Sequence, residues 1–301
     1  MPLLMNLFCG KNFSFSLTPT NVSNINYIRL SAGIFDSLFV SKNSNIEYDE
    51  SKRQWDFDTK IFAHFRNNLF GGNVDYTSDI VSAIRVKRRK KGIYKWDTIY
   101  EIPIKTNEDF KFERFDRTVR SKTDYQYSLV PVINNIEGNL NTNEIKTDFE
   151  GFYFIEKETV IRAILNAAIS STNRNFSGNI IETKGREKPF FITNSKLNYE
   201  SGTIQATFID QDLNNEWDIE NAWKYRQQVD DFLSNGKPKI LKCDDGRMWL
   251  VAIVPNSVKN VVSHHDNVIT TINWVEIGDA ENVADLIDNG FLDLDPRLVR
   301  S

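Results

Sequence analysis

Apolar and polar side chains alternate along much of the first half of the chain. Between residues 80 and 104, the order Ile84, Arg85, Val86, Lys87 places apolar side chains on one face of an extended strand and charged side chains on the other. A Lys-Lys-Gly sequence interrupts this alternation, and a second apolar run follows it. The pattern therefore predicts a β-hairpin with a basic turn.

Short strand-like runs continue at close spacing up to residue 147. Aromatic residues recur over 110–116, an alternating run covers 125–132, and the sequence Asn-Asn-Ile-Glu-Gly at 134–138 is typical of a turn. An earlier alternation at 61–66 fits one more strand with a single buried face. Several short strands separated by turn residues are typical of a β-sandwich.

The second half of the chain, from about residue 151, has a different pattern. Residues 199–208 alternate cleanly and predict a long strand, whereas 160–165 fit either a strand or a helix. Further short strands are predicted at 179–183, 188–193, 239–243, 248–254 and 268–277.

Residues 218–234 have the spacing of an amphipathic helix. Asp218 is predicted as its N-cap, and Gly236 as the residue that ends it. A second, short helix is predicted near residues 282–288. The predicted apolar face of the longer helix consists of Ile219, Ala222, Trp223, Val229, Phe232 and Leu233.

The strands between residues 80 and 147 resemble the later strands of a fibronectin type III domain. In that family a tyrosine-bearing strand packs under a corner of the sandwich. The resemblance implies a β-sandwich but names no function. It rests on the strand 84–89, on Trp96, on 110–116, on Tyr125 and Tyr127, and on the turn 134–138.

Three segments of the second half resemble tail and baseplate proteins of bacteriophages. They are residues 189–204, the helix end 232–238, and the stretch 241–251, which contains Asp-Gly-Arg followed closely by Trp. A helix, a glycine turn, a strand, an Asp-Gly-Arg hairpin and a strand beginning near Trp are similar to the barrel-like domain of distal tail proteins. Those proteins use this domain to build rings around the tail channel.

These patterns and resemblances predict a mostly β chain with one amphipathic helix. Residues 45–150 are predicted as a fibronectin type III-like β-sandwich and residues 151–301 as a distal-tail-like β-barrel domain. Residues 1–44 are predicted as an N-terminal segment that packs on the C-terminal domain or on a neighbour. Distal tail proteins carry the ring-building domain first, whereas here the sandwich comes first. A distal ring, a baseplate wedge or hub-associated protein and a peripheral tail protein therefore all stay open.

The composition indicates the class of protein and the cellular compartment in which it is made. The chain is 40% hydrophobic and 26% charged with a net charge of -4, so it is globular and does not require a nucleic-acid partner. Two cysteines, Cys9 and Cys243, form no disulfide framework, and whether they pair stays open. No apolar run reaches the roughly 18 residues of a membrane span, and no basic signal region precedes the apolar start. We expect a soluble protein, made in a bacterial cytoplasm and assembled into a virion tail.

The candidate chemistry does not predict an enzyme, and we expect no metal and no cofactor. The three histidines are His64, His264 and His265, and neighbouring residues on a strand face opposite sides, so the adjacent pair does not readily share a metal. The sequence Asp-Asp-Gly-Arg at 244–247 lacks the spaced acidic ligands of a calcium loop. A tight hairpin turn explains it.

The strand and turn from residue 85 to residue 91 form the strongest basic run. One interpretation is contact with nucleic acid or an acidic wall polymer. The other is a solvated hairpin, or a tip that docks an acidic partner protein, and the acidic remainder of the chain favours it. The residues of this run are Arg85, Lys87, Arg88, Arg89, Lys90 and Lys91.

The resemblance implies a structural function, in which the chain forms a ring of three or six copies and binds other tail proteins. A tail protein that binds a host receptor or cell-wall polysaccharide through Trp rings is the first alternative. A tail-associated hydrolase is the second, although no carboxylate pair stands out. The candidate interface or structural residues are Leu3, Leu4, Leu7, Phe8, Trp96, Tyr125, Tyr127, Trp223, Gly236, Asp245, Gly246, Arg247 and Trp249.

Overall fold

The described part of the chain is mostly β, with two antiparallel main sheets and two α-helices. The computed structural model describes residues 3–8, 14–16, 28–34, 37–41, 60–64, 77–138, 141–163, 165–193, 196–210, 217–264 and 267–298, and the first five of these ranges as backbone only. The following side chains lie outside the described part: Leu3, Leu4, Leu7, Phe8, Cys9, His64, His264 and His265.

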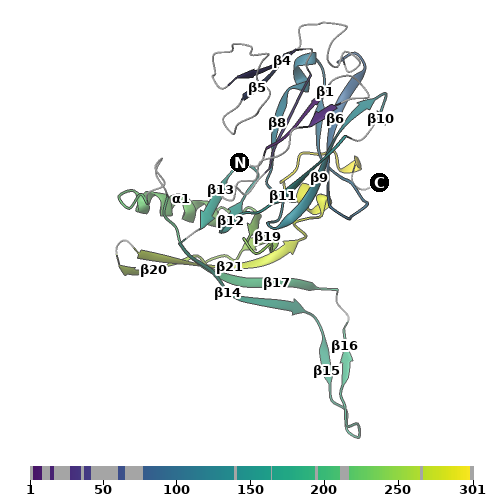
Figure 1. The fold of residues 1–301 in the computed structure, drawn as a ribbon. Helices are drawn as coiled ribbons and strands as arrows, with labels where there is room; N and C mark the ends of the chain where they lie inside the picture. Colours follow the sequence, from purple (N-terminus) through teal and green to yellow (C-terminus); the bar gives the residue numbers. More distant parts are fainter. Residues whose placement is uncertain are drawn as a thin grey trace. The chain divides into compact units, whose positions relative to one another are not determined.

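The chain divides into two compact units (Figure 1). The first comprises residues 1–149 together with 292–301, and the second comprises residues 150–291. Each unit has its own sheet and its own buried side chains. The change of sequence pattern near residue 151 lies one or two residues from this division.

The main sheet of the first unit has five strands in the order β10-β9-β6-β7, with β11 also paired to β9. A second sheet has the order β2-β1-β3-β8, in which β3 is antiparallel to β8 and parallel to β1. A strand of the predicted segment 1–44 therefore lies beside a strand of the predicted domain 45–150. The strands are β1 (Leu3–Phe8), β2 (Ser14–Ser16), β3 (Ile28–Ile34), β4 (Ser37–Ser41), β5 (Lys60–His64), β6 (Val81–Lys90), β7 (Asp97–Pro103), β8 (Phe112–Asp116), β9 (Thr123–Ile133), β10 (Ile136–Glu137) and β11 (Asn141–Thr147).

The predicted hairpin over residues 80–104 is confirmed, because β6 pairs with β7 in antiparallel register. The turn predicted at 134–138 joins β9 to β10, and Asn134 and Asn135 adopt positive φ angles of 51° and 63° there. Asparagine tolerates this left-handed backbone region better than most residues, and a two-residue hairpin turn requires it. The aromatic run at 110–116 forms the 3-10 helix η1 (Asn107–Phe110) followed by β8.

A buried ion pair lies between β6 and the end of β8. Arg88 Nη1 is 2.8 Å from Asp116 Oδ2, and their side chains are only 6% and 2% exposed. Arg88 Nη1 also donates to Thr118 Oγ1 at 2.7 Å, and the Tyr127 hydroxyl donates to Asp116 Oδ2 at 2.7 Å. Burial alone raises the pKa of Asp116, but Arg88 and the hydrogen bonds from Tyr127 and Thr118 hold the pKa of this carboxyl below its usual value.

The second unit is built on an eight-stranded antiparallel sheet in the order β13-β12-β18-β19-β21-β17-β14, with β20 also paired to β21. Within the described residues this sheet does not close into a barrel, because its end strands β13 and β14 are not paired with each other. The stretch that fitted either a strand or a helix is the strand β13. The elements are β12 (Phe152–Ile155), β13 (Val160–Ala163), β14 (Leu165–Phe176), β17 (Asn198–Thr207), α1 (Ala222–Ser234), β18 (Lys239–Lys242), β19 (Met248–Ile253), β20 (Lys259–His264), β21 (Asn267–Gly278) and α2 (Val283–Asp288).

Helix α1 begins four residues later than the sequence predicts. Asn221 is its N-cap, and Asp218 instead accepts the Asn221 N–H at 3.1 Å in the turn before it. Its buried residues are Ala222, Val229, Phe232 and Leu233. Trp223, predicted on this apolar face, is 58% exposed, because one step along a helix rotates the side chain by about 100° from Ala222.

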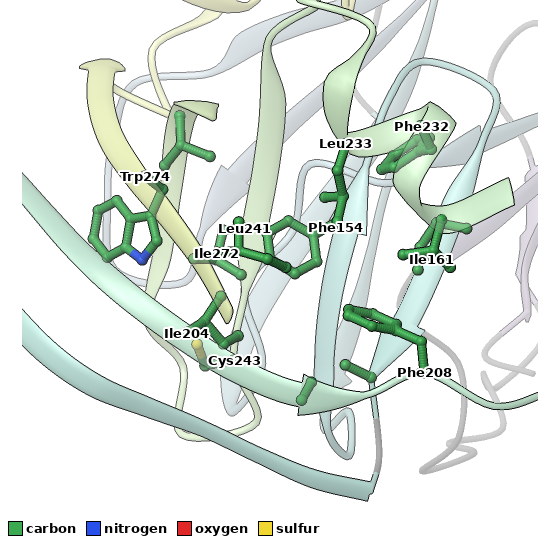
Figure 2. Close-up of a cluster of buried hydrophobic side chains, with 14 of the residues drawn as sticks. Phe154, Ile161, Ile204, Phe208, Phe232, Leu233, Leu241, Cys243, Ile272 and Trp274 are labelled. Carbon is green, nitrogen blue, oxygen red and sulfur yellow. The ribbon is translucent and has the colours of Figure 1, made fainter. Parts of the chain in front are cut away.

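Figure 2 shows how α1 packs onto the sheet: Leu233 lies beside Phe154 of β12, and Phe232 lies nearer Ile161 of β13. Leu241 of β18 and Ile272 of β21 belong to the same buried cluster. Removing such side chains from water is the main contribution that holds a helix onto a sheet. Cys243 is also buried in this cluster, and its burial raises the pKa of the thiol.

Two predicted turns of this unit are confirmed. Gly236 follows the helix with a φ of 74°, and Gly246 lies between β18 and β19 with a φ of 95°. Glycine adopts these angles without the steric cost that a β-carbon imposes. Beside the second turn, Arg247 Nε donates to Asp245 Oδ2 at 2.7 Å, so this pair closes the tip of the hairpin.

The buried pair in the first unit makes a quantitative prediction. Asp116→Asn leaves the Arg88 guanidinium buried without its carboxylate, so the free energy of unfolding falls by about 3–5 kcal/mol. Lys91→Met, which removes a pair in which both side chains are about half exposed, leaves the denaturant midpoint nearly unchanged. The pKa of Asp116 is lower in the folded than in the unfolded chain, so its carboxylate stabilises the fold at any pH above the unfolded pKa. This stabilisation is lost as the pH falls through the folded pKa. Equal midpoints for the two variants in urea would contradict this account.

Candidate assembly surface

A two-stranded ribbon extends from one side of the second unit. β14 pairs with β17 from Leu165 to Phe176, and the ribbon continues into a short hairpin of β15 (Asn179–Ile181) and β16 (Phe190–Ile192). Figure 1 shows this hairpin beyond the ends of β14 and β17, away from the remaining strands of the sheet. We call the described residues of 176–197 the arm. The two short strands predicted around Gly185 are confirmed.

A close backbone approach fixes the base of the ribbon. A β-carbon at Gly202 in β17 would lie 2.5 Å from the Ser171 carbonyl oxygen and 2.7 Å from Trp274 Cζ2. Only glycine fits there, so β14 lies directly against β17 over the buried Trp274 ring. Register shifts in β14, between Leu165 and Ala168 and between Ile169 and Ser171, bend the ribbon at this level.

Hydrogen bonds between polar side chains link the two strands of the ribbon. Arg174 Nε donates to Asn198 Oδ1 at 2.8 Å, and Asn175 Nδ2 donates to Ser201 Oγ at 2.8 Å. Farther along, Thr193 Oγ1 donates to the Ser177 carbonyl at 2.6 Å. These contacts link the two sides of the ribbon and of the base of the arm.

The arm exposes apolar side chains that a globular fold normally buries. Both strands β15 and β16 are exposed along their whole length. A two-stranded hairpin without a covered face is only marginally stable in water, and exposed apolar patches mark interaction sites. The large apolar residues exposed on the arm are Phe176, Ile180, Ile181, Phe190, Phe191, Ile192 and Leu197.

A shallow groove lies where the hairpin joins the ribbon. Phe176, Phe191 and Leu197 supply its apolar lining, and Arg174 and Lys196 add basic side chains to it. The Phe191 ring packs on Gly178, where a β-carbon would come within 2.4 Å of the ring. The arm therefore carries a shaped apolar surface and not only isolated exposed side chains.

The charges on the arm are mixed in sign. Lys184, Arg186 and Lys188 are interspersed along the loop with Glu182 and Glu187. The Arg186 guanidinium carbon lies 3.8 Å from the centroid of the Phe190 ring, which shields part of that ring. A surface of mixed charge around apolar residues suits a protein partner better than a polyanion.

The predicted basic run is largely paired within the chain. Arg85 contacts Glu101 at 2.7 Å and Glu137 at 2.9 Å, and Lys91 contacts Glu144 at 2.8 Å. Arg88 belongs to the buried pair described above and does not lie on the surface.

Two further members of the run also have partners on the same chain. Lys87 lies against Glu137, and the Arg89 guanidinium carbon is 4.4 Å from the centroid of the Trp96 ring. These intrachain partners reduce the positive field that a nucleic acid would need.

The other candidate residues are dispersed. Tyr125, Tyr127 and Trp249 are buried in their units, whereas Trp223 is exposed. Trp249 Nε1 donates to Glu200 Oε2 at 2.6 Å, so this ring is held inside the sheet. In the described part of the chain, no group of three or more His, Cys, Asp and Glu side chains is placed to hold a metal ion.

The comparisons found no matching family model, no matching curated protein and no matching solved structure. Among the described helices, none is long and apolar enough to cross a membrane.

The exposed apolar surface of the arm was not among the sequence predictions, although a signal for it exists. Phe190, Phe191 and Ile192 are consecutive in a predicted strand, and successive side chains of a strand point to opposite faces. A short hairpin strand that is apolar on both faces must expose one face unless layers cover both. The sequence alone does not say whether another part of this unit covers the arm.

The close approach at Gly202 makes the second prediction. Gly202→Ala pushes β14 away from β17 and lowers the free energy of unfolding by about 1–3 kcal/mol. Gln205→Ala, at an exposed position of the same strand, is the matched control and has little effect. Thermal unfolding followed by circular dichroism measures both variants, and an unchanged midpoint for Gly202→Ala would refute the contact.

Proposed function

We propose that this chain is a structural component of a bacteriophage tail or baseplate, or of a related tail-like particle, and that it assembles with copies of itself. The observation that carries the proposal is the exposed apolar arm of the second unit. Its occupant in this proposal is a different surface of a neighbouring copy, because a head-to-tail contact can close into a ring. The ring has three or six copies, and other tail proteins bind it.

Self-assembly removes the apolar side chains of the arm from water, where their exposure is costly. Each fully buried Phe, Ile or Leu side chain contributes roughly 1.5–3 kcal/mol, so covering most of the exposed apolar side chains of the arm is comparable to the roughly 4–15 kcal/mol that association costs. The end strand β14 adds a second element, because within the described residues only β17 pairs with it. A neighbouring strand that pairs with this free edge would extend the sheet from one copy to the next.

The second unit supports the resemblance to distal tail proteins through its order of elements. Helix α1 leads through Gly236 into β18, and the Asp245-Gly246 turn leads into β19, which begins with Met248 and Trp249. The predicted barrel is an open sheet in the described residues. In the proposal, the ring is formed by neighbouring copies of the chain and does not require this sheet to close into a barrel.

The first unit supports the resemblance to a fibronectin type III-like sandwich. The antiparallel strands β7, β6, β9 and β11 lie side by side, and β8 pairs with β3 in a separate sheet. The Tyr125 hydroxyl accepts the N–H of Arg120, five residues upstream, at 3.0 Å. A tyrosine that bonds back to the preceding backbone at the start of a strand is typical of such sandwiches. The unit would present a surface to neighbours or to the host cell.

One observation favours a second candidate function, glycan binding. Trp223 is 58% exposed, and Lys224 Nζ lies 5.7 Å from the centroid of its ring. An exposed indole with a polar neighbour is suited to stacking on a sugar. Quenching of Trp fluorescence by cell-wall glycans that disappears in Trp223→Ala would support this candidate, and unchanged fluorescence would remove it.

The third prediction tests the proposed assembly. Purified protein is expected to elute as a closed oligomer in light scattering, with rings in negative-stain images of the same fractions. Ile180→Asp places a charge on the arm and shifts the population toward monomer, with the secondary structure unchanged. Ile136→Asp is the matched control, because Ile136 is 71% exposed, close to the 69% of Ile180, but lies in the first unit. A wild-type monomer at all concentrations would refute self-assembly.

A further inference from the structure

A buried lysine meets an asparagine and a glutamate at the end of helix α1. Lys239 is the first residue of β18, Asn235 is the C-cap of α1, and Glu156 follows β12 directly. Lys239 Nζ lies 2.7 Å from Glu156 Oε1 and 2.7 Å from Asn235 Oδ1. Asn235 Nδ2 donates to the same Glu156 Oε1 at 2.6 Å. One carboxylate oxygen therefore contacts both the amine and the amide nitrogen.

Lys239 is enclosed, and Nζ also donates to the Lys237 backbone carbonyl at 2.8 Å. Its side chain is 0% exposed, and Nζ lies 4.8 Å from the centroid of the Phe232 ring. Burial lowers the pKa of Lys239, and the hydrogen bond and charge of Glu156 offset this only in part. The lowered pKa makes it easier for the Lys239 amine to lose a proton. The neutral amine is the form of lysine that acts as a nucleophile.

The amide of Asn235 is held as an electrophile. Its Oδ1 accepts the Lys237 backbone N–H at 2.9 Å in addition to the bond from Lys239. When the Lys239 amine attacks the attached carbon, the Lys237 N–H stays on this oxygen and stabilises the negative charge that develops there. Burial raises the pKa of Glu156, but the hydrogen bonds from Asn235 and Lys239 hold it below its usual value, so this carboxylate carries its charge beside the amine.

We propose that Lys239 and Asn235 react with each other to form an intramolecular isopeptide bond, with Glu156 as the proton carrier. Glu156 takes a proton from Nζ, and Nζ attacks Cγ of Asn235 to form a new C–N bond. The bond from Cγ to Nδ2 then breaks, and Glu156 returns the proton to the leaving nitrogen. The leaving group is ammonia, which carries away the second proton as ammonium. No oxidant, metal or cofactor enters this balance.

The product has a clear physical effect on the fold. It links the residue that ends α1 to the residue that begins β18, across the turn that contains Gly236. It also removes a buried ammonium, whose desolvation is costly. Asn235 itself is exposed, which gives the released ammonium a route to solvent. This inference does not depend on the proposed tail function.

A competing reaction shares one product. Asn235 precedes Gly236, and the backbone nitrogen of Gly236 can attack the same carbon to form a succinimide, which also releases ammonia. The two reactions differ at Lys239, which is modified only in the isopeptide. Trypsin cleaves after an unmodified lysine but not before proline, so Lys237 is not cut in either case.

The fourth prediction follows from this difference and uses the full chain. Intact-mass spectrometry shows a loss of about 17 Da in the wild-type protein, one ammonia. Tryptic mapping then yields residues 227–242 as one peptide that carries this loss, because cleavage after Lys239 is blocked. Lys239→Arg and Glu156→Gln retain the full mass. Lys237→Arg is the control for a neighbouring lysine and keeps the loss.

Other outcomes would overturn the inference. A wild-type peptide 227–239 of unmodified mass shows that no bond has formed. The same peptide with the mass loss, and the loss in Lys239→Arg, would assign it to the succinimide. Loss of ammonia in Glu156→Gln would overturn the role given to Glu156. Because the wild-type peptide map alone decides whether the bond exists, a variant that fails to fold does not change that result.

Discussion

The pairing of β17 with β21 on one side and with β14 on the other is the constraint on which the second unit depends. Ile204 and Ala206 of β17 are buried in the core, whereas the same strand pairs Asn198 with Phe176 at the base of the arm. The core therefore sets the register of the arm, and Gly202 keeps the two strands in contact between these levels. A rigid sheet that continues into an exposed apolar hairpin is a direct way to present one surface to a neighbouring copy.

Each unit also contains a buried charge, and the two charges have different consequences. Arg88 is held by Asp116 in a pair with several hydrogen bonds, which is expensive to break but chemically inert, since a guanidinium does not lose its proton. Lys239 can lose a proton, and it contacts an amide oxygen that also accepts the Lys237 backbone N–H. Burial therefore stabilises one unit through an ion pair and places a nucleophile beside an electrophile in the other.

Much of the fold could be predicted from alternation and turn residues, since the hairpin β6–β7, the long strand β17 and the turns at Gly236 and Gly246 follow from local preferences. Residues 170–175 of β14 were missed because they are polar, and an edge ribbon needs no alternation. Trp223 was misplaced because the buried stripe of α1 is narrow. Alternation along β6 places Arg88 on the face of Ile84 and Val86, so its burial was readable; its partner Asp116 was not, because tertiary packing selects it.

Hydrogen–deuterium exchange tests the central claim, that the arm is covered by a neighbouring copy, most directly. The account predicts that backbone amides of β15 and β16 exchange quickly in a dilute, dissociated sample and slowly in the assembled fraction, while the amides of β18 and β19 exchange slowly in both. Equally fast exchange of the arm in both samples would contradict it, because the arm would then remain open to water after assembly.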